Sequence, residues 1–239
     1  MKRNLVIAAA VAGVAVLALI GAGGFIYFFS GLRTSPDTLG LSGATPNATA
    51  GSTNATNLTG KWNIATGSLV GYRVQELFAG ESSKHLAVAR TSDVSGSLTI
   101  SGDASGYTVN GITLTTNLTS LHSVDQVAGR NVSQRDGVVT RQLAVQQFPN
   151  ATFTSSSASV PGSFSSAQAD VSAPGKLTIH GVTKDVTATA KAQMVGDRVE
   201  IAGTLTINMT DYGVSPPQAP FVTVDPTATI EFDIFLTKA

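Results

Sequence analysis

Apolar and polar residues alternate with a period of two along most of the chain after residue 60. Between Val94 and Ile100, apolar or small residues occupy every second position, and serine or threonine stands between them. Such alternation is typical of β-strands that bury one face and expose the other. The pattern recurs over residues 112–115, 177–180, 186–192, 199–207 and 228–236.

Turn-forming residues separate these runs, as at residues 101–103, 195–197 and 215–217. We therefore predict about eight antiparallel strands. The only helix that we expect in this region is a short one over residues 138–147, which Pro149 would end. A closed barrel and a two-sheet sandwich would both produce this alternation, so the pattern leaves these two architectures open.

The N-terminal residues follow a different pattern. Residues 5–29 form a run of 25 residues without a charge, long enough to cross a hydrocarbon core of about 30 Å as a helix. Residues 1–4 include Lys2 and Arg3, and basic residues favour the cytoplasmic side. We predict a transmembrane signal anchor with a cytoplasmic N-terminus and an extracytoplasmic remainder, the alternative being a cleaved secretory signal.

Residues 30–59 are mostly Ser, Thr, Gly, Ala and Asn, with Arg33 and Asp37 as the only charges. This composition predicts a flexible, disordered linker. The globular domain would then occupy residues 60–239 and remain close to the membrane.

Composition excludes several functions. The formal net charge is zero and only 13% of residues are charged, which disfavours a nucleic-acid-binding surface. The chain contains no cysteine, so it lacks disulfides, thiolate metal sites and lipidated cysteines. Any membrane attachment must be made by the peptide itself.

No catalytic or metal-binding arrangement stands out. His85, His122 and His180 are dozens of residues apart without paired ligand spacing, so we predict no metal site. Serine is abundant, yet the chain has no Gly-X-Ser-X-Gly motif. We predict a protein that is not an enzyme and has no cofactor. An enzyme acting on an envelope lipid would need an acid and a nucleophile clustered with His180.

Several short motifs occur in a specific order. The most distinctive is Leu-Thr-Ile-His-Gly-Val-Thr-Lys over residues 177–184. The others are Gly60-Lys-Trp62, residues 67–74 and 94–98, Arg135-Asp136, residues 148–153 and Asp211-Tyr-Gly213. Together they resemble the YceI-like polyisoprenoid-binding family over roughly residues 60–239. The resemblance implies an extended, lipocalin-like antiparallel barrel with an isoprenoid lipid or isoprenoid quinone in its interior.

The inward faces of the strands supply the candidate ligand-binding residues. Small residues such as Ala188 and Ala190 favour a cavity, although a solid core remains an alternative, and with it a structural or adhesion role in the cell envelope. The candidates are Val70, Tyr72, Val74, Leu98, Ile100, Ile112, Leu114, Phe153, Leu177, Ile179, Ala188, Ala190, Ile201, Leu205, Ile230, Phe232 and Ile234.

Three arginines in one polar segment, Arg130, Arg135 and Arg141, are candidates for contacting the polar head of a lipid. The alternative is that Arg135 and Asp136 brace the barrel. His180 likewise has two interpretations, as a ligand contact or as a turn residue whose ring bonds a nearby backbone group.

Overall fold

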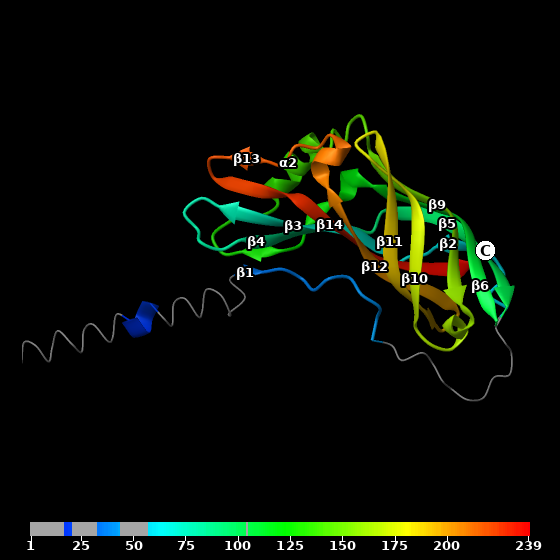
Figure 1. The fold of residues 1–239 in the computed structure, drawn as a ribbon. Coiled ribbons are helices and arrows are strands. Elements are labelled where there is room, and N and C mark those ends of the chain that lie inside the picture. Colours follow the sequence, from blue (N-terminus) through cyan, green and yellow to red (C-terminus); the bar gives the residue numbers. More distant parts are fainter. Residues whose placement is uncertain (1–16, 21–32, 44–56, 104) are drawn as a thin grey trace, which may run out of the picture.

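The longest strand closes the sheet on itself (Figure 1). β14 (Val222–Lys238) pairs along one edge with β12 (Arg198–Asn208), from the Leu236–Val199 pair to the Thr227–Asn208 pair. Its other edge pairs with β2 (Gly60–Ile64) and with β3 (Leu69–Phe78). Because β14 pairs with β12 along one edge and with β2 along the other, it closes a ring of strands into a barrel, and the sandwich alternative is excluded.

Eight strands form the closed antiparallel barrel, in the order β12-β11-β10-β9-β6-β5-β2-β14. This architecture confirms the predicted all-β barrel. The bounds of the remaining strands are β5 (Val94–Asp103), β6 (Gly106–Asn117), β9 (Asn150–Pro161), β10 (Ala169–Ile179) and β11 (Val182–Val195).

A hairpin of β3 and β4 (His85–Thr91) extends the sheet beyond β14, and β7 (His122–Ser123) pairs with β4. β13 (Gln218–Ala219) pairs with the start of β14. Short 3-10 helices connect several strands, namely η1 (Leu118–Ser120), η2 (Gly162–Ser165) and η3 (Met209–Tyr212). Figure 1 shows β13 and the tip of the β3–β4 hairpin at one end of the barrel and the β5–β6 hairpin at the other.

The predicted short helix is present but shifted. α2 spans Gln134–Gln142, so it begins four residues before the predicted start at residue 138. Its first turn carries the acidic Asp136, and a negative charge there stabilises the helix because the N-terminal end of the helix dipole is positive. The helix ends early because Ala144 adopts a left-handed backbone conformation, with φ of +44°.

The structure is a computed structural model that describes residues 17–20, 33–43, 57–103 and 105–239. Residues 17–20 are helical, and the rest of the predicted transmembrane segment, residues 5–29, lies outside the described residues. Within the described part of the chain, no helix combines the length and the apolarity needed to span a bilayer.

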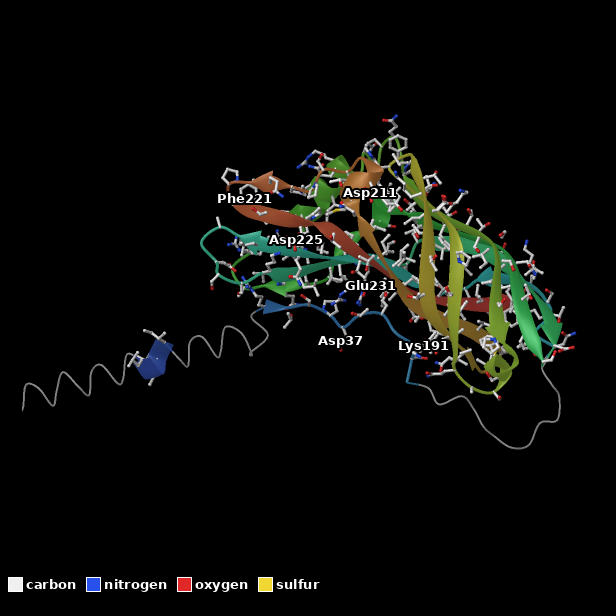
Figure 2. The ribbon with its side chains drawn as sticks, viewed as in Figure 1. Asp37, Lys191, Asp211, Phe221, Asp225 and Glu231 are labelled. Atoms are coloured by element: carbon white, nitrogen blue, oxygen red, sulfur yellow. The ribbon has the colours of Figure 1, made fainter. Side chains whose placement is uncertain are left out.

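Residues 33–43 form an extended segment along the outside of the barrel, which we call the strap. It begins with β1 (Arg33–Thr34), which pairs with β8 (Gln126–Val127). In Figure 2 the strap, marked by Asp37, runs along the barrel near Glu231. The strap differs from the flexible linker predicted over residues 30–59. Residues 30–32 and 44–56 of that predicted linker lie outside the described residues.

Buried charges of the barrel hold the strap in place. Glu231 on β14 is 0% exposed and accepts hydrogen bonds from Arg73 at 3.1 Å, from Arg90 at 2.8 Å and from the Leu39 backbone N–H at 3.1 Å. Arg73 also donates to the Pro36 carbonyl at 2.8 Å. Because these groups are withdrawn from water, each needs its partner, and the strap supplies some of them.

A second contact holds the far end of the strap. Glu200 on β12 is buried and accepts from the Ser42 backbone N–H at 2.6 Å and from the Ser42 hydroxyl at 2.8 Å. The Gln193 amide donates to the Ser42 carbonyl at 3.0 Å and to Glu200 at 2.6 Å. The strap is therefore attached at both ends.

Candidate functional site

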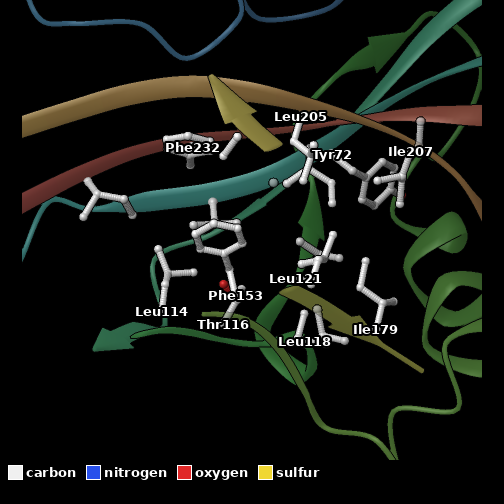
Figure 3. A pocket seen from close by; sticks show the side chains of 18 of the residues that line it. Tyr72, Leu114, Thr116, Leu118, Leu121, Phe153, Ile179, Leu205, Ile207 and Phe232 are labelled. Carbon is white, nitrogen blue, oxygen red and sulfur yellow. The ribbon is translucent and has the colours of Figure 1, made fainter. Parts of the chain in front are cut away.

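The barrel encloses a cavity of about 1010 Å³, at the upper end of the range of roughly 300–1,000 Å³ typical of small-molecule sites. All seventeen candidate residues on the inward strand faces line it. Figure 3 shows Leu114, Phe153 and Phe232, from three different strands, directed into the same space. The structure therefore places these side chains together, and their contact with a ligand stays a prediction.

The cavity exists because part of the inward surface carries side chains too small to fill a barrel. β11 contributes Ala188, Ala190 and Ala192, and β10 contributes Ala173. Side chains alternate across each strand, so these alanines leave the space that longer residues would fill. The solid-core alternative does not match this interior.

One end of the cavity is closed by packed aromatic side chains. Phe164 on η2 and Tyr107 on β6 are both buried and meet edge to face, with ring centroids 6.4 Å apart. Nearby in the same hydrophobic cluster, Trp62 is buried and donates from its indole to the Leu58 carbonyl at 2.8 Å. A ligand of any length would therefore enter from the other end.

At that other end the cavity reaches the surface, and we call this opening the mouth. Phe221 lines the cavity and is 64% exposed. Phe78 and Arg130 also line it, and the Arg130 guanidinium lies 3.9 Å from the centre of the Phe78 ring. The charged residues on the cavity wall are Glu76, Arg130 and Arg135, among the described residues. The interior is thus largely apolar, with a few Ser and Thr side chains on its wall, and its charges lie at the mouth.

Four charged or titratable side chains cluster beside the mouth. Arg135 on α2 contacts Glu76 on β3 at 2.6 Å and Asp125 at 2.7 Å. Asp125 also lies 2.6 Å from the Nε2 atom of His85 on β4 and accepts from the Val88 backbone N–H at 3.0 Å. These contacts join the helix to the β3–β4 hairpin.

The environment of this cluster keeps Asp125 ionised. Burial alone raises the pKa of a carboxyl, but hydrogen bonds from His85 and Arg135 outweigh it and hold the pKa of Asp125 well below its usual range. The pKa of Arg135 is raised, since its bonds to Asp125 and the charge of Glu76 outweigh the opposing effect of burial. Burial also raises the pKa of the Tyr72 hydroxyl, so this cavity residue stays protonated.

The cluster also contains the donor atoms of a possible metal site, which the sequence did not predict. Ligand atoms of Glu76, His85 and Asp125 lie within 4.8 Å of one another. Arg135 bonds to both carboxylates and so takes the place that a cation would occupy between them. These residues therefore fit an internal ion-pair network better than a metal ion.

The three arginine candidates have different positions. Arg135 lines the cavity while bracing the mouth, and Arg130 lines the cavity at the surface. Arg141 is exposed and does not line the cavity, because Gln134, Val138 and Gln142, spaced by four residues, form the face of α2 that does. The structure therefore does not bring Arg141 to the candidate site.

His180 has the role of a turn residue. Its backbone is left-handed, with φ of +52°, and its Nδ1 atom lies 3.2 Å from the Tyr212 carbonyl oxygen. The Phe148 ring packs edge to face against it, with centroids 5.3 Å apart. Among the described residues, no acidic side chain hydrogen-bonds to His180, so the catalytic cluster considered above does not form around it.

Comparisons with known proteins agree with this geometry. A family model described as the YceI-like domain matches residues 62–236. Two UPF0312 proteins, from Pseudomonas putida strains F1 and KT2440, are each 37% identical over 95 residues, which is 37% of this chain and 47% of theirs. The matched region thus spans about half the length of these curated relatives.

Among solved structures, the chain resembles a polyisoprenoid binding domain from Saccharophagus degradans implicated in plant cell wall breakdown. The TM-score is 0.50 at 16% identity, and the match covers 76% of this chain and 99% of that domain. At this identity, the likeness supports the shared fold alone.

Proposed function

Because the chain belongs to the YceI-like domain family, we propose that it is a binding protein that holds a long isoprenoid lipid in its barrel. The observation that carries the proposal is the shape and polarity of the cavity. It is largely apolar within the barrel, closed at one end by Phe164 and Tyr107, and charged only at the mouth, among the described residues. A polyprenyl lipid or an isoprenoid quinone has the matching form, with a long apolar chain and one polar head.

The energetics favour exchange with a membrane over release into water. Burying each CH₂ group removes about 0.8 kcal/mol of unfavourable hydration. A bilayer provides nearly the same stabilisation, so transfer from bilayer to barrel is close to balanced. Selectivity must then come from the shape of the cavity and from polar contacts at the mouth, where Arg130 and Arg135 carry the positive charges and Asn131, Gln134 and Gln142 add amide groups.

We further propose that residues 5–29 anchor the chain in the cell membrane, with the barrel on the extracytoplasmic side. The uncharged run of 25 residues after Lys2 and Arg3 supports this placement. An anchored barrel stays beside its lipid reservoir, which suits carriage or sequestration of a lipid. We propose binding and not catalysis, because the charged cluster at the mouth is internally paired.

The test is to block the cavity from inside. Ala190 on β11 faces the cavity, and its neighbour Thr189 faces solvent. We expect A190W, in residues 33–239 secreted from a lipid-containing host, to lose the lipid that mass spectrometry detects in organic extracts. T189W should retain it, and circular dichroism should show that both variants are folded. Equal lipid recovery from the two variants, or no lipid in the parent protein, would refute the proposal.

A further inference from the structure

Among the described residues of the barrel, Phe221 is the large hydrophobic residue that is exposed, at 64%. It lies in the turn between β13 and β14, and its carbonyl accepts a hydrogen bond from the Ala79 N–H at 3.0 Å. Phe78 pairs with Val222 in the adjoining strands. The turn with Phe221 and the tip of the β3–β4 hairpin therefore form one edge of the mouth, which we call the lip.

The strap begins at this same edge. Arg33 forms an ion pair with Glu81, in the turn of the β3–β4 hairpin, and its guanidinium lies 3.2 Å from the Ser83 hydroxyl. Backbone pairing of Arg33 with Val127 gives a second attachment. Because the turn that holds Arg33 also adjoins Phe221, the N-terminal end of the strap and the lip are at the same end of the barrel, as Figures 1 and 2 show.

The predicted membrane segment ends close to this attachment. Only Ser30, Gly31 and Leu32 separate Phe29 from Arg33, and four residues of extended chain span at most about 14 Å. The ordered strap therefore makes the effective tether much shorter than the 30-residue linker that composition suggests. A barrel held so close to a bilayer at its mouth end cannot turn that end far from the membrane surface.

We propose that the lip is a membrane-docking surface, with Phe221 inserted among the lipids of the leaflet into which the N-terminal segment is anchored. The inference rests on the proposed anchor and cavity, and it adds the orientation of the barrel. A lipid would pass between the leaflet and the cavity along an apolar path from Phe221 to Phe78 and Val222, all three of which line the cavity. Phe is among the residues that peripheral membrane surfaces bury at the boundary of headgroups and acyl chains, so an exposed Phe221 beside the mouth suits the membrane interface.

The absence of cysteine allows a direct test by single-cysteine labelling of the full chain. F221C, labelled with an environment-sensitive nitrobenzoxadiazole dye, is reconstituted into phosphatidylcholine and phosphatidylglycerol vesicles that contain doxyl-labelled phosphatidylcholine. The matched control is D197C, at an exposed position in the β11–β12 turn at the opposite end of the barrel. We expect a blue-shifted, strongly quenched signal from F221C and an unquenched signal from D197C. P220C, also exposed in the lip, repeats the measurement while leaving Phe221 intact.

A second variant tests the tether. Inserting about twelve Gly and Ser residues between Ser30 and Gly31 lengthens the connection to a typical reach of about 20–24 Å, and quenching at the lip should decrease. Quenching at residues 220 and 221 no stronger than at residue 197 would overturn the proposal, as would failure of the full chain to float with the vesicles. If lipid is recovered from the parent barrel but the lip is unquenched, the docking surface alone is refuted. Quenching with an empty barrel would refute the cavity function and keep the docking surface.

Discussion

Replacing Arg135 by methionine removes the cation from the buried cluster at the mouth. Glu76 and Asp125 are 3% and 2% exposed, and Arg135 bonds to both of them. Methionine keeps the apolar stem that lines the cavity and removes the guanidinium. Two carboxylates would then share a buried space with His85 as their remaining partner in the cluster.

Removal of one partner from a buried ion pair typically costs 3–5 kcal/mol, because the other charge is left without compensation. Arg135 keeps a side-chain exposure of 14%, so water can partly replace it, and we expect a loss near the lower limit, about 3 kcal/mol. For a domain of this size that corresponds to a decrease of about 6–12 °C in Tm.

The assay is urea denaturation followed by circular dichroism, with R141M as the control. Arg141 lies on the same helix but is exposed and forms no ion pair with the described residues, so R141M should change the free energy of unfolding by less than about 0.5 kcal/mol. A loss in R135M no larger than that in R141M would refute the bracing role.

The effect of R135M should depend on pH. In the parent protein the depressed pKa of Asp125 stabilises the fold above the unfolded-state pKa of about 4, and this contribution is lost as pH falls towards the folded-state pKa. R135M lacks part of this contribution at neutral pH, so its deficit should shrink as the pH falls below about 4. A deficit that grows on acidification would contradict this explanation.

Three further changes test other parts of the structure. Burial and the charge of Glu200 raise the pKa of Asp233 to about 6, so its ionisation lowers stability as pH rises from about 4 to 6. D233N should therefore stabilise the fold by about 1 kcal/mol above pH 6 and not below pH 4, as measured by urea denaturation. E231Q, which neutralises the partner of two arginines, should destabilise the barrel by about 3 kcal/mol and speed hydrogen exchange in the strap, and unchanged exchange there would count against the strap contacts. F164A should cost about 3–5 kcal/mol and open the closed end, whereas a loss below 1 kcal/mol in thermal denaturation would show that Phe164 is not a plug.

Much of the cavity wall could be predicted from local pattern. In a β-strand, side chains alternate between the two faces of the sheet, so the apolar positions of β5, β11 and β14 show which side chains point into the barrel. For this reason Leu98, Ala190 and Phe232 all lie on the cavity wall as expected. Arg141 was a candidate only because it shares one polar segment with Arg130 and Arg135, and membership of a segment does not show which side chains of α2 face the cavity; Arg141 does not line it.

The charged cluster could not be predicted in the same way. Arg135 and Glu76 are 59 residues apart in the chain, and Asp125 and His85 are 40 apart. None of these residues has a local spacing that suggests a partner. They meet because the β3–β4 hairpin extends past β14 and the segment before α2 pairs with β4 through β7. The Arg135-Asp136 motif marked one member of the cluster and gave no sign of the others.

The strap shows the limit of composition as a guide to order. Its sequence offers little apolar surface to bury, which predicts a flexible chain, but the buried carboxylates of Glu231 and Glu200 on the barrel accept hydrogen bonds from its backbone. These two carboxylates belong to strands more than 150 residues away, and no window around the strap contains them.

The sequence by itself thus determined the class of fold, the inward face of each strand and the ordered motifs of the family, because these depend on side-chain alternation and local turns. Tertiary structure alone decided that the barrel is hollow, that one end is closed and the other charged, and that the strap starts at the mouth. Each of these features depends on which distant segments meet when β14 closes the sheet against β12. Closure of a sheet is a long-range event, and a period of two along one strand carries no information about the partner across it.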